Sequence, residues 1–108
     1  MAVSDAQIEN VRELFDGVGP ITTRKMFGGL GIYQEGRIFA VVMSDGTLRL
    51  KGAGDMVAVL DAAGWERWTY TRDGSDTLRS MPYWSLPEAL LDDPEEASAW
   101  ARRALEAL

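Results

Sequence analysis

The spacing of apolar residues changes along this chain. Near the N-terminus these residues recur at intervals of three and four, which is typical of an amphipathic helix, and the pattern predicts a helix over about residues 5–16. Ser4 stands three residues before Gln7, the spacing of a capping box, and Gly17 suits the end of the helix. From residue 30 onward, short segments rich in β-branched and aromatic residues replace that spacing. A helix followed by strands is therefore predicted.

Turn sequences divide the rest of the chain into short strands. About five strands are predicted, over residues 30–33, 37–43, 47–51, 65–71 and 77–84. Gly36 and Gly46, each preceded by an acidic residue, lie between the first three strands and match tight hairpin turns. In the third strand leucines alternate with polar residues, so one face of the sheet should be buried and the other exposed.

Further helices are predicted after the strands. One covers residues 55–63 with Asp55 as its N-cap, a short helical turn runs from Pro87 to Leu91, and a last helix is capped by Asp93. The fold class is thus α+β, an antiparallel sheet of about five strands with helices packed on one face. Consecutive hairpin turns disfavour a parallel sheet. A chain of 108 residues forms a single domain, residues 1–108.

The chain has no cysteine and no histidine. Thiolate and imidazole chemistry is therefore excluded, and with it cysteine proteases, Ser-His-Asp hydrolases, structural zinc sites and haem held by histidine. Asp73, Ser75 and Asp76 offer oxygen ligands but lack the further acids of a calcium loop, so a polar hairpin tip is the simpler interpretation. The acidic pairs around the start of the last helix fit capping better than acid–base catalysis. We expect no enzyme, no metal and no cofactor.

The formal net charge is −6 at pH 7, which disfavours direct DNA binding through the field of the whole protein. The charge is uneven, because residues 22–54 hold five basic and two acidic residues, whereas residues 81–108 hold two basic and six acidic ones. The N-terminus lacks a basic stretch followed by an apolar one, and the longest apolar run, Ile38 to Met43, is far too short to span a bilayer. We expect a cytoplasmic protein without a membrane contact.

Two cations and two glycines stand close together before the first predicted strand. Backbone donors at Gly28 and Gly29, beside the side chains of Arg24 and Lys25, suit an anion. The motif is neither a P-loop nor a dinucleotide fingerprint, because a strand rather than a helix should follow it. The alternative interpretation is structural, a bulge or sharp bend at which glycine avoids a steric clash. The sequence leaves both interpretations open.

A basic face of the sheet is the second candidate site. The residues that suggest it are Arg24, Arg37, Arg49 and Lys51, with the aromatic residues Tyr33 and Phe39 in the same region. Sheet faces of this kind bind single nucleic-acid strands. The alternative is the solvated outer face of an antiparallel sheet, which the net charge favours. Trp65, Trp68 and Trp100 are interpreted as core or sheet-surface packing, and next as an interface.

A series of motifs runs in order along nearly the whole chain: Arg24 to Gly29, Gly31 to Tyr33 with Gly36 and Phe39, Leu48 to Lys51, Met81, Tyr83, Trp84, Leu86 and Pro87, and Trp100, Ala101 and Ala104. This series resembles the N-terminal domain of the TfoX/Sxy family of bacterial competence regulators. Pro82 departs from the family, which usually has serine at that place. No helical C-terminal domain follows Leu108, so we expect a stand-alone N-terminal domain.

This resemblance implies a transcriptional co-regulator that acts with another protein, either a transcription regulator or a polymerase component. We therefore expect a small cytoplasmic regulatory and protein-interaction module. The residues assigned to its partner-binding or anion-binding surface are Arg24, Lys25, Gly28, Gly29, Tyr33 and Lys51. The alternative function is binding of a phosphate-bearing small molecule or nucleic acid at the cluster formed by the first four of these residues. A homodimer is compatible with the sequence.

Overall fold

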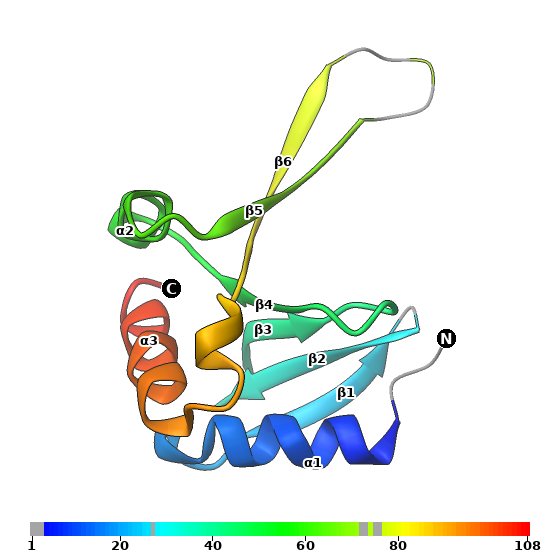
Figure 1. Cartoon of the computed structure of the whole chain (residues 1–108), viewed down its shortest axis with the longest axis vertical. Helices are drawn as coiled ribbons and strands as arrows, with labels where there is room; N and C mark the ends of the chain where they lie inside the picture. Colours follow the sequence, from blue (N-terminus) through cyan, green and yellow to red (C-terminus); the bar gives the residue numbers. More distant parts are fainter. Residues whose placement is uncertain (1–3, 27, 72–73, 75–76) are drawn as a thin grey trace.

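A computed structural model describes residues 4–26, 28–71, 74 and 77–108 of the chain. Helices and strands follow one another along the chain (Figure 1). The elements are α1 (Asp5–Leu14), η1 (Asp16–Val18), β1 (Thr22–Met26), β2 (Gly29–Gln34), β3 (Arg37–Val42), β4 (Leu48–Lys51), α2 (Asp55–Ala62), β5 (Glu66–Thr71), β6 (Leu78–Ser85), η2 (Glu88–Leu90) and α3 (Pro94–Glu106). The α+β class predicted from the sequence is confirmed.

All neighbouring strands of the sheet pair antiparallel, in the order β1-β2-β3-β4-β6-β5. The described residues form six strands, where the sequence predicted about five. The additional strand is β1, whose sequence Thr-Thr-Arg-Lys-Met has no apolar alternation to signal it. Because β1 is an edge strand with a largely exposed surface, backbone pairing with β2 holds it in place rather than side-chain burial.

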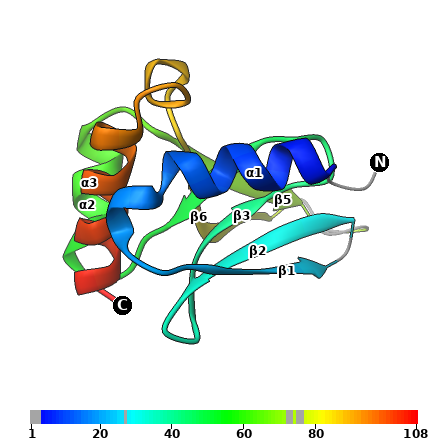
Figure 2. The ribbon, with the colours of Figure 1, turned by 90° about the horizontal axis from the view of Figure 1, so that it is seen from below.

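The hydrophobic core lies between the sheet and the three α-helices, on what we call the helix face (Figure 2). Phe15 at the end of α1 packs edge-on against Phe39 of β3, with ring centroids 5.3 Å apart. The buried hydroxyl of Ser98 on α3 donates to the carbonyl of Leu14 and accepts from the backbone N–H of Gly17. This pair of hydrogen bonds joins the last helix to the end of the first one and satisfies backbone groups that the helix end leaves free.

Helix α2 closes the same face at the other end of the sheet. Trp84 of β6 is fully buried, and its indole N–H donates to the carboxylate of Asp61 on α2 over 2.8 Å. A Cβ at Gly52 would approach both Leu60 and Trp84 to 2.8 Å, so the chain entering α2 passes closely over that indole. The predicted packing of the helices on one face of the sheet is confirmed.

The helix starts mostly agree with the predicted caps. Ser4 and Gln7 form the complete capping box, and Asp93 accepts a hydrogen bond from the backbone of Glu96 at the start of α3. The cap predicted for α2 is wrong, because Gly54 is the N-cap and no side chain caps it. Asp55 is instead the first helical residue, where its negative charge interacts favourably with the positive end of the helix dipole.

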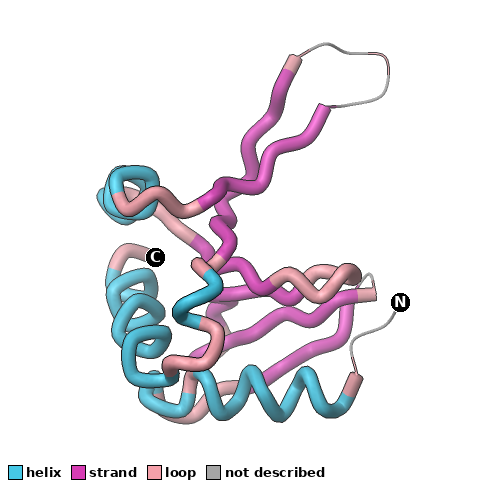
Figure 3. Tube along the Cα trace, viewed as in Figure 1, coloured by secondary structure: helices cyan, strands magenta, loops and turns pink. Residues whose placement is uncertain are grey.

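Strands β5 and β6 form a hairpin that projects from the body (Figures 1 and 3) and contributes to a longest dimension of 41 Å. The predicted polar tip at Asp73, Ser75 and Asp76 lies outside the described residues. Within the described ranges, no group of three or more acidic side chains could hold a metal ion. No helix among these residues is both long and apolar enough to cross a membrane.

Candidate interaction surface on the open face of the sheet

Strand pairing defines a second face of the sheet, which we call the open face. One row of paired residues crosses it from β1 to β4, namely Arg24, Gly31, Val41 and Arg49. Because paired residues in a sheet project to the same side, this row points away from Leu30 and its neighbours in the core. In the part of the chain that the structure describes, all three helices lie on the other side (Figure 2).

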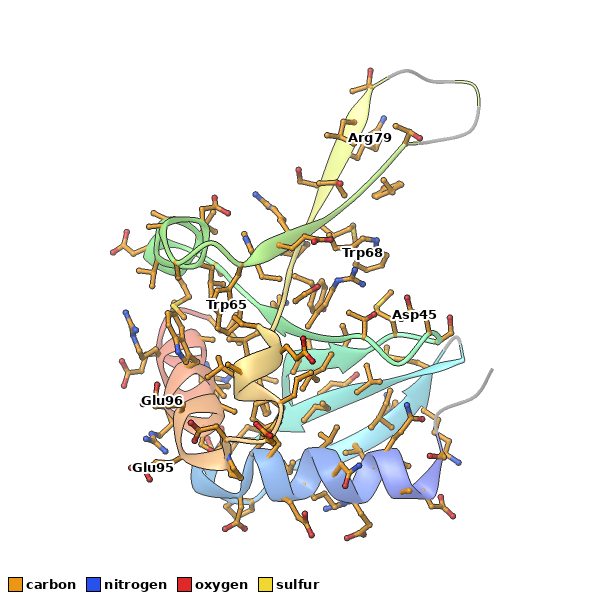
Figure 4. All side chains as sticks on the ribbon, in the orientation of Figure 1. Asp45, Trp65, Trp68, Arg79, Glu95 and Glu96 are labelled. Carbon is orange, nitrogen blue, oxygen red and sulfur yellow. The ribbon has the colours of Figure 1, made fainter. Side chains whose placement is uncertain are left out.

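A groove of about 300 Å³ lies on this open face. Half-buried apolar side chains from β1, β3, β5 and β6, and from the residue that follows β3, line most of it: Met26, Ile38, Val41, Met43, Trp68, Met81 and Tyr83. Three of them are methionines, of which the chain has five. Because the hairpin bends away from strands β1 to β3, Trp68 reaches into the angle between the hairpin and the body (Figure 4). The groove is therefore a product of the sheet's twist.

An aromatic and cationic cluster flanks the groove. The rings of Trp68 and Tyr83 lie 6.3 Å apart, and the guanidinium carbon of Arg49 lies 5.3 Å from the centre of the Trp68 ring. The Nε atom of Arg49 is buried and has no hydrogen-bond partner among the described residues. Burial, with a smaller contribution from Tyr33, raises the pKa of Tyr83 above its ordinary value. The phenol of Tyr83 thus remains a neutral hydrogen-bond donor at physiological pH.

A carboxylate near the end of the groove is already engaged in its own turn. Asp45 accepts a hydrogen bond of 2.9 Å from the backbone N–H of Thr47. This hydrogen bond is the main reason why the pKa of Asp45 is lowered, and the positive charge of Arg49 adds a smaller lowering. The exposed side chain of Asp45 therefore stabilises the turn between β3 and β4.

The structure places three of the residues assigned from the sequence on the open face. Arg24 and Tyr33 line a shallow hollow of about 310 Å³ beside Thr22. Lys51 pairs with Tyr83 across β4 and β6 and lines a neighbouring hollow of about 350 Å³. These three polar residues thus surround an apolar centre that sequence analysis did not identify.

Lys25 does not join them. It follows Arg24 on strand β1 and therefore points to the opposite side of the sheet, where it is exposed. Its strand partner is Leu30, whose side chain belongs to the core. The pair of cations that stood out in the sequence is thus divided between the two faces.

The two adjacent glycines have structural explanations. Gly28 adopts φ +78° in the turn between β1 and β2, a conformation that favours glycine. A Cβ at Gly29 would collide with the backbone carbonyl oxygen of Val42 on β3. These constraints account for the two glycines by backbone geometry and by the avoidance of a steric clash, in line with the structural alternative of a bulge or sharp bend.

The apolar centre of the open face left a partial signal in the sequence. Strand β3 lies in an unbroken apolar run, which is typical of a strand that is covered on both faces. Met81 and Tyr83 join the groove through the non-local pairing of β4 with β6.

Phe39 does not belong to the basic face to which the sequence analysis assigned it. A register shift between β2 and β3 leaves Phe39 without a partner residue on β2, and its ring packs against Phe15 in the core.

Comparison with known proteins gives two findings. The TfoX N-terminal domain family matches residues 13–108 of the chain. Over 110 aligned residues the chain is 24% identical to the DNA transformation protein TfoX1 of Aliivibrio fischeri, covering 98% of this chain and 51% of that protein. The chain therefore spans about half the length of this curated relative.

Proposed function

The chain belongs to the TfoX N-terminal domain family, and from this premise we propose that it is a regulatory protein-interaction module whose partner binds the open face. The partner is a protein of the transcription machinery, either a transcription regulator or a polymerase component. The relative from A. fischeri is named as a DNA transformation protein. We extend a role in the control of DNA transformation to this chain, acting in the cytoplasm.

One observation carries this proposal, namely the half-buried apolar groove on a sheet face that the described helices leave uncovered. Contiguous apolar surface on a small protein commonly marks an interaction site. Aromatic residues, methionine and arginine are the types enriched in protein interfaces, and Trp68, Tyr83, Met81 and Arg49 gather here. A partner that covers the groove would remove these side chains from water and so gain binding free energy.

The proposal assigns no catalysis to the domain. Cysteine and histidine are missing from the sequence. The pKa shifts of Asp45 and Tyr83 have structural causes, a turn hydrogen bond at Asp45 and burial at Tyr83. The proposal likewise assigns no phosphate or nucleic-acid site, because Arg24 and Lys25 point to opposite faces and the adjacent glycines serve the hairpin.

Affinity capture with a matched pair of variants tests the proposal. The wild-type domain is compared with Met81→Asp, which places a charge in the groove, and with Leu78→Asp, which places the same charge at an exposed position on the same strand. We expect Met81→Asp to reduce recovery of a transcription protein by at least about tenfold, because burying an unpaired charge opposes binding. Leu78→Asp should recover it normally.

Both variants must first show the wild-type circular dichroism spectrum and a cooperative unfolding transition. If Met81→Asp and the wild type recover the same proteins in the same amounts, the open face is not the partner surface and the proposal fails.

A further inference from the structure

We infer that the open face binds an acidic peptide segment of its partner, which inserts apolar side chains into the groove and places a carboxylate on Arg49. This inference rests on the proposed function and specifies the chemistry of the partner at that surface. It is carried by the shape of the groove, by an unsatisfied donor beside it and by the local excess of positive charge.

The groove suits side chains of a short segment. Its volume is about 300 Å³, which is at the small end of the range for sites that enclose a whole ligand. Met26, Met43 and Met81 contribute unbranched thioether side chains, which adjust their conformation to different apolar partners. Met-rich grooves of this kind accept the apolar face of a peptide, with anchoring residues at helical or strand spacing.

Arg49 supplies the specific donor. Among the residues that the structure describes, two arginines stack on tryptophans of the sheet, and they differ in one respect. The Nε of Arg67, whose guanidinium lies over Trp84, donates to the carbonyl of Met81 over 2.9 Å. The Nε of Arg49, over Trp68, is buried without a partner. A buried donor without an acceptor is unfavourable, so a ligand that displaces the side chains covering the Nε of Arg49 and supplies an acceptor gains the energy of that hydrogen bond.

A carboxylate matches this donor best. The guanidinium presents its N–H groups in a planar fork that a carboxylate can accept with two hydrogen bonds. The chain's own carboxylate in this region, Asp45, is held by the N–H of Thr47. The stacking of Arg49 on Trp68 also fixes the guanidinium in place, which reduces the entropy that binding would otherwise cost.

The surrounding charge favours an acidic segment over a neutral one. Lys51, two residues along β4, and Arg24, three strands away on β1, lie on the same face as Arg49. Among the described residues, strand pairing places one carboxylate on this face, Glu66 on β5, two strands from Arg49. The whole chain carries −6, but electrostatic screening at physiological ionic strength limits the reach of distant charges to roughly 8 Å. A peptide that lies across the open face therefore passes close to Arg24, Arg49 and Lys51, and meets the carboxylates of Glu66 on β5 and Asp45 at the rim.

The same charges argue against a second copy of the chain as the occupant. A symmetric dimer through this face would bring identical surfaces together, so the cations of one copy would approach those of the other. Like charges that approach within an interface oppose association. An acidic peptide avoids this repulsion and satisfies Arg49 at the same time.

Peptide selection followed by affinity measurement tests the inference. Random peptides of about twelve residues are selected against the immobilised domain, and the affinity of the best binder is measured by fluorescence anisotropy. We expect selected sequences in which leucine or aromatic residues stand beside aspartate or glutamate. Replacing those acids by their amides should weaken binding by roughly tenfold, as expected for the loss of a hydrogen bond between charged groups.

Domain variants locate the contact. Arg49→Met should weaken binding by roughly tenfold, and Arg49→Lys should weaken it less because the charge remains. Arg79→Met is the matched control, since Arg79 lies on the projecting part of the hairpin, away from Trp68 (Figure 4). Met81→Asp should abolish measurable binding.

Three results would overturn the inference: selected peptides without acidic enrichment, an affinity of Arg49→Met within twofold of the wild type, or a dimer in sedimentation that Met81→Asp dissociates. The proposed function is judged separately by affinity capture. If the transcription protein is still lost with Met81→Asp while the peptides show no acidic preference, the proposed function stands and only the peptide chemistry is wrong. If capture is unchanged as well, both fail.

Discussion

The helix face and the open face are built from the same strands, yet they bury their side chains to different degrees. On the helix face Phe39, Leu50 and Trp84 are 0%, 1% and 0% exposed. On the open face Val41, between the buried residues Ala40 and Val42, and Met81 are only half-buried. The difference arises because helices cover the first face, whereas on the second only the bend of the hairpin shields the apolar side chains.

The two faces of the sheet therefore have different roles: the helix face stabilises the fold, and the open face is available for binding. Side chains on the helix face have already left water, so changing them should lower the free energy of unfolding. Side chains on the open face keep part of their contact with water, so the remainder of their burial is available to a partner. Four predictions test this separation, in order of decreasing effect.

The largest effect is expected on the helix face. Phe39→Ala removes a fully buried ring that packs against Phe15, and should lower the free energy of unfolding by about 3–5 kcal/mol through lost burial and the cavity left behind. Urea denaturation followed by circular dichroism measures this. A loss below about 1 kcal/mol would mean that Phe39 is not part of the central core.

Two adjacent valines of β3 compare the faces directly. Val42 is 4% exposed on the helix face, and Val41 is half-buried on the open face. Val42→Ala should lower the free energy of unfolding by about 2 kcal/mol, and Val41→Ala by less than about 1 kcal/mol, because the same methyl groups are lost from unequally buried sites. Equal losses in parallel denaturation curves would contradict the difference between the faces.

The effects of the same two substitutions on peptide affinity should follow the opposite order. Val41→Ala reduces the apolar lining of the groove and should weaken binding of the selected acidic peptide by about threefold. Val42 also borders the groove, but its side chain is 4% exposed and lies on the helix face, so Val42→Ala should change the affinity less. Fluorescence anisotropy at a temperature where both variants are folded gives the two affinities. A weaker affinity for Val42→Ala than for Val41→Ala would show that the peptide binds elsewhere.

The smallest effect concerns acid stability at the rim of the open face. Because folding lowers the pKa of Asp45, mainly through the hydrogen bond from Thr47, its charged form stabilises the folded state above the unfolded pKa of about 3.9. This stabilisation is lost as the pH falls through the folded pKa. Asp45→Asn should therefore show a slightly shallower loss of melting temperature between pH 5 and pH 2 in thermal scans, and an identical pH profile would show that the carboxylate contributes nothing.

Local signals in the sequence predicted much of the fold. The capping box of α1, the Asp93 cap of α3 and the hairpins around Gly36 and Gly46 each depend on residues only a few positions apart. The alternation of Leu48 and Leu50 with polar residues also predicted the two faces of β4. Strand β1 was missed because its residues are mostly polar and its place at the sheet edge comes from pairing with β2.

The candidate site was only partly predictable. Arg24, Tyr33 and Lys51 share the open face as residues of one surface, but Lys25 lies on the other side because adjacent strand residues alternate. The groove between these residues was not predicted, since Met26 and Met81 come from strands far apart in the chain. No local sequence pattern predicts that these two strands line the same groove.

Element types, most turns and caps, and the family could be predicted from the amino-acid sequence, because each of these depends on neighbouring residues or on an ordered series of motifs. Which residues share a surface depends instead on how the strands pair and pack. Pairing of β4 with β6 rather than β5, and the bend of the hairpin, bring Trp68 and Met81 beside Val41. These are long-range backbone contacts, and their geometry arises when the whole sheet twists and packs against its helices.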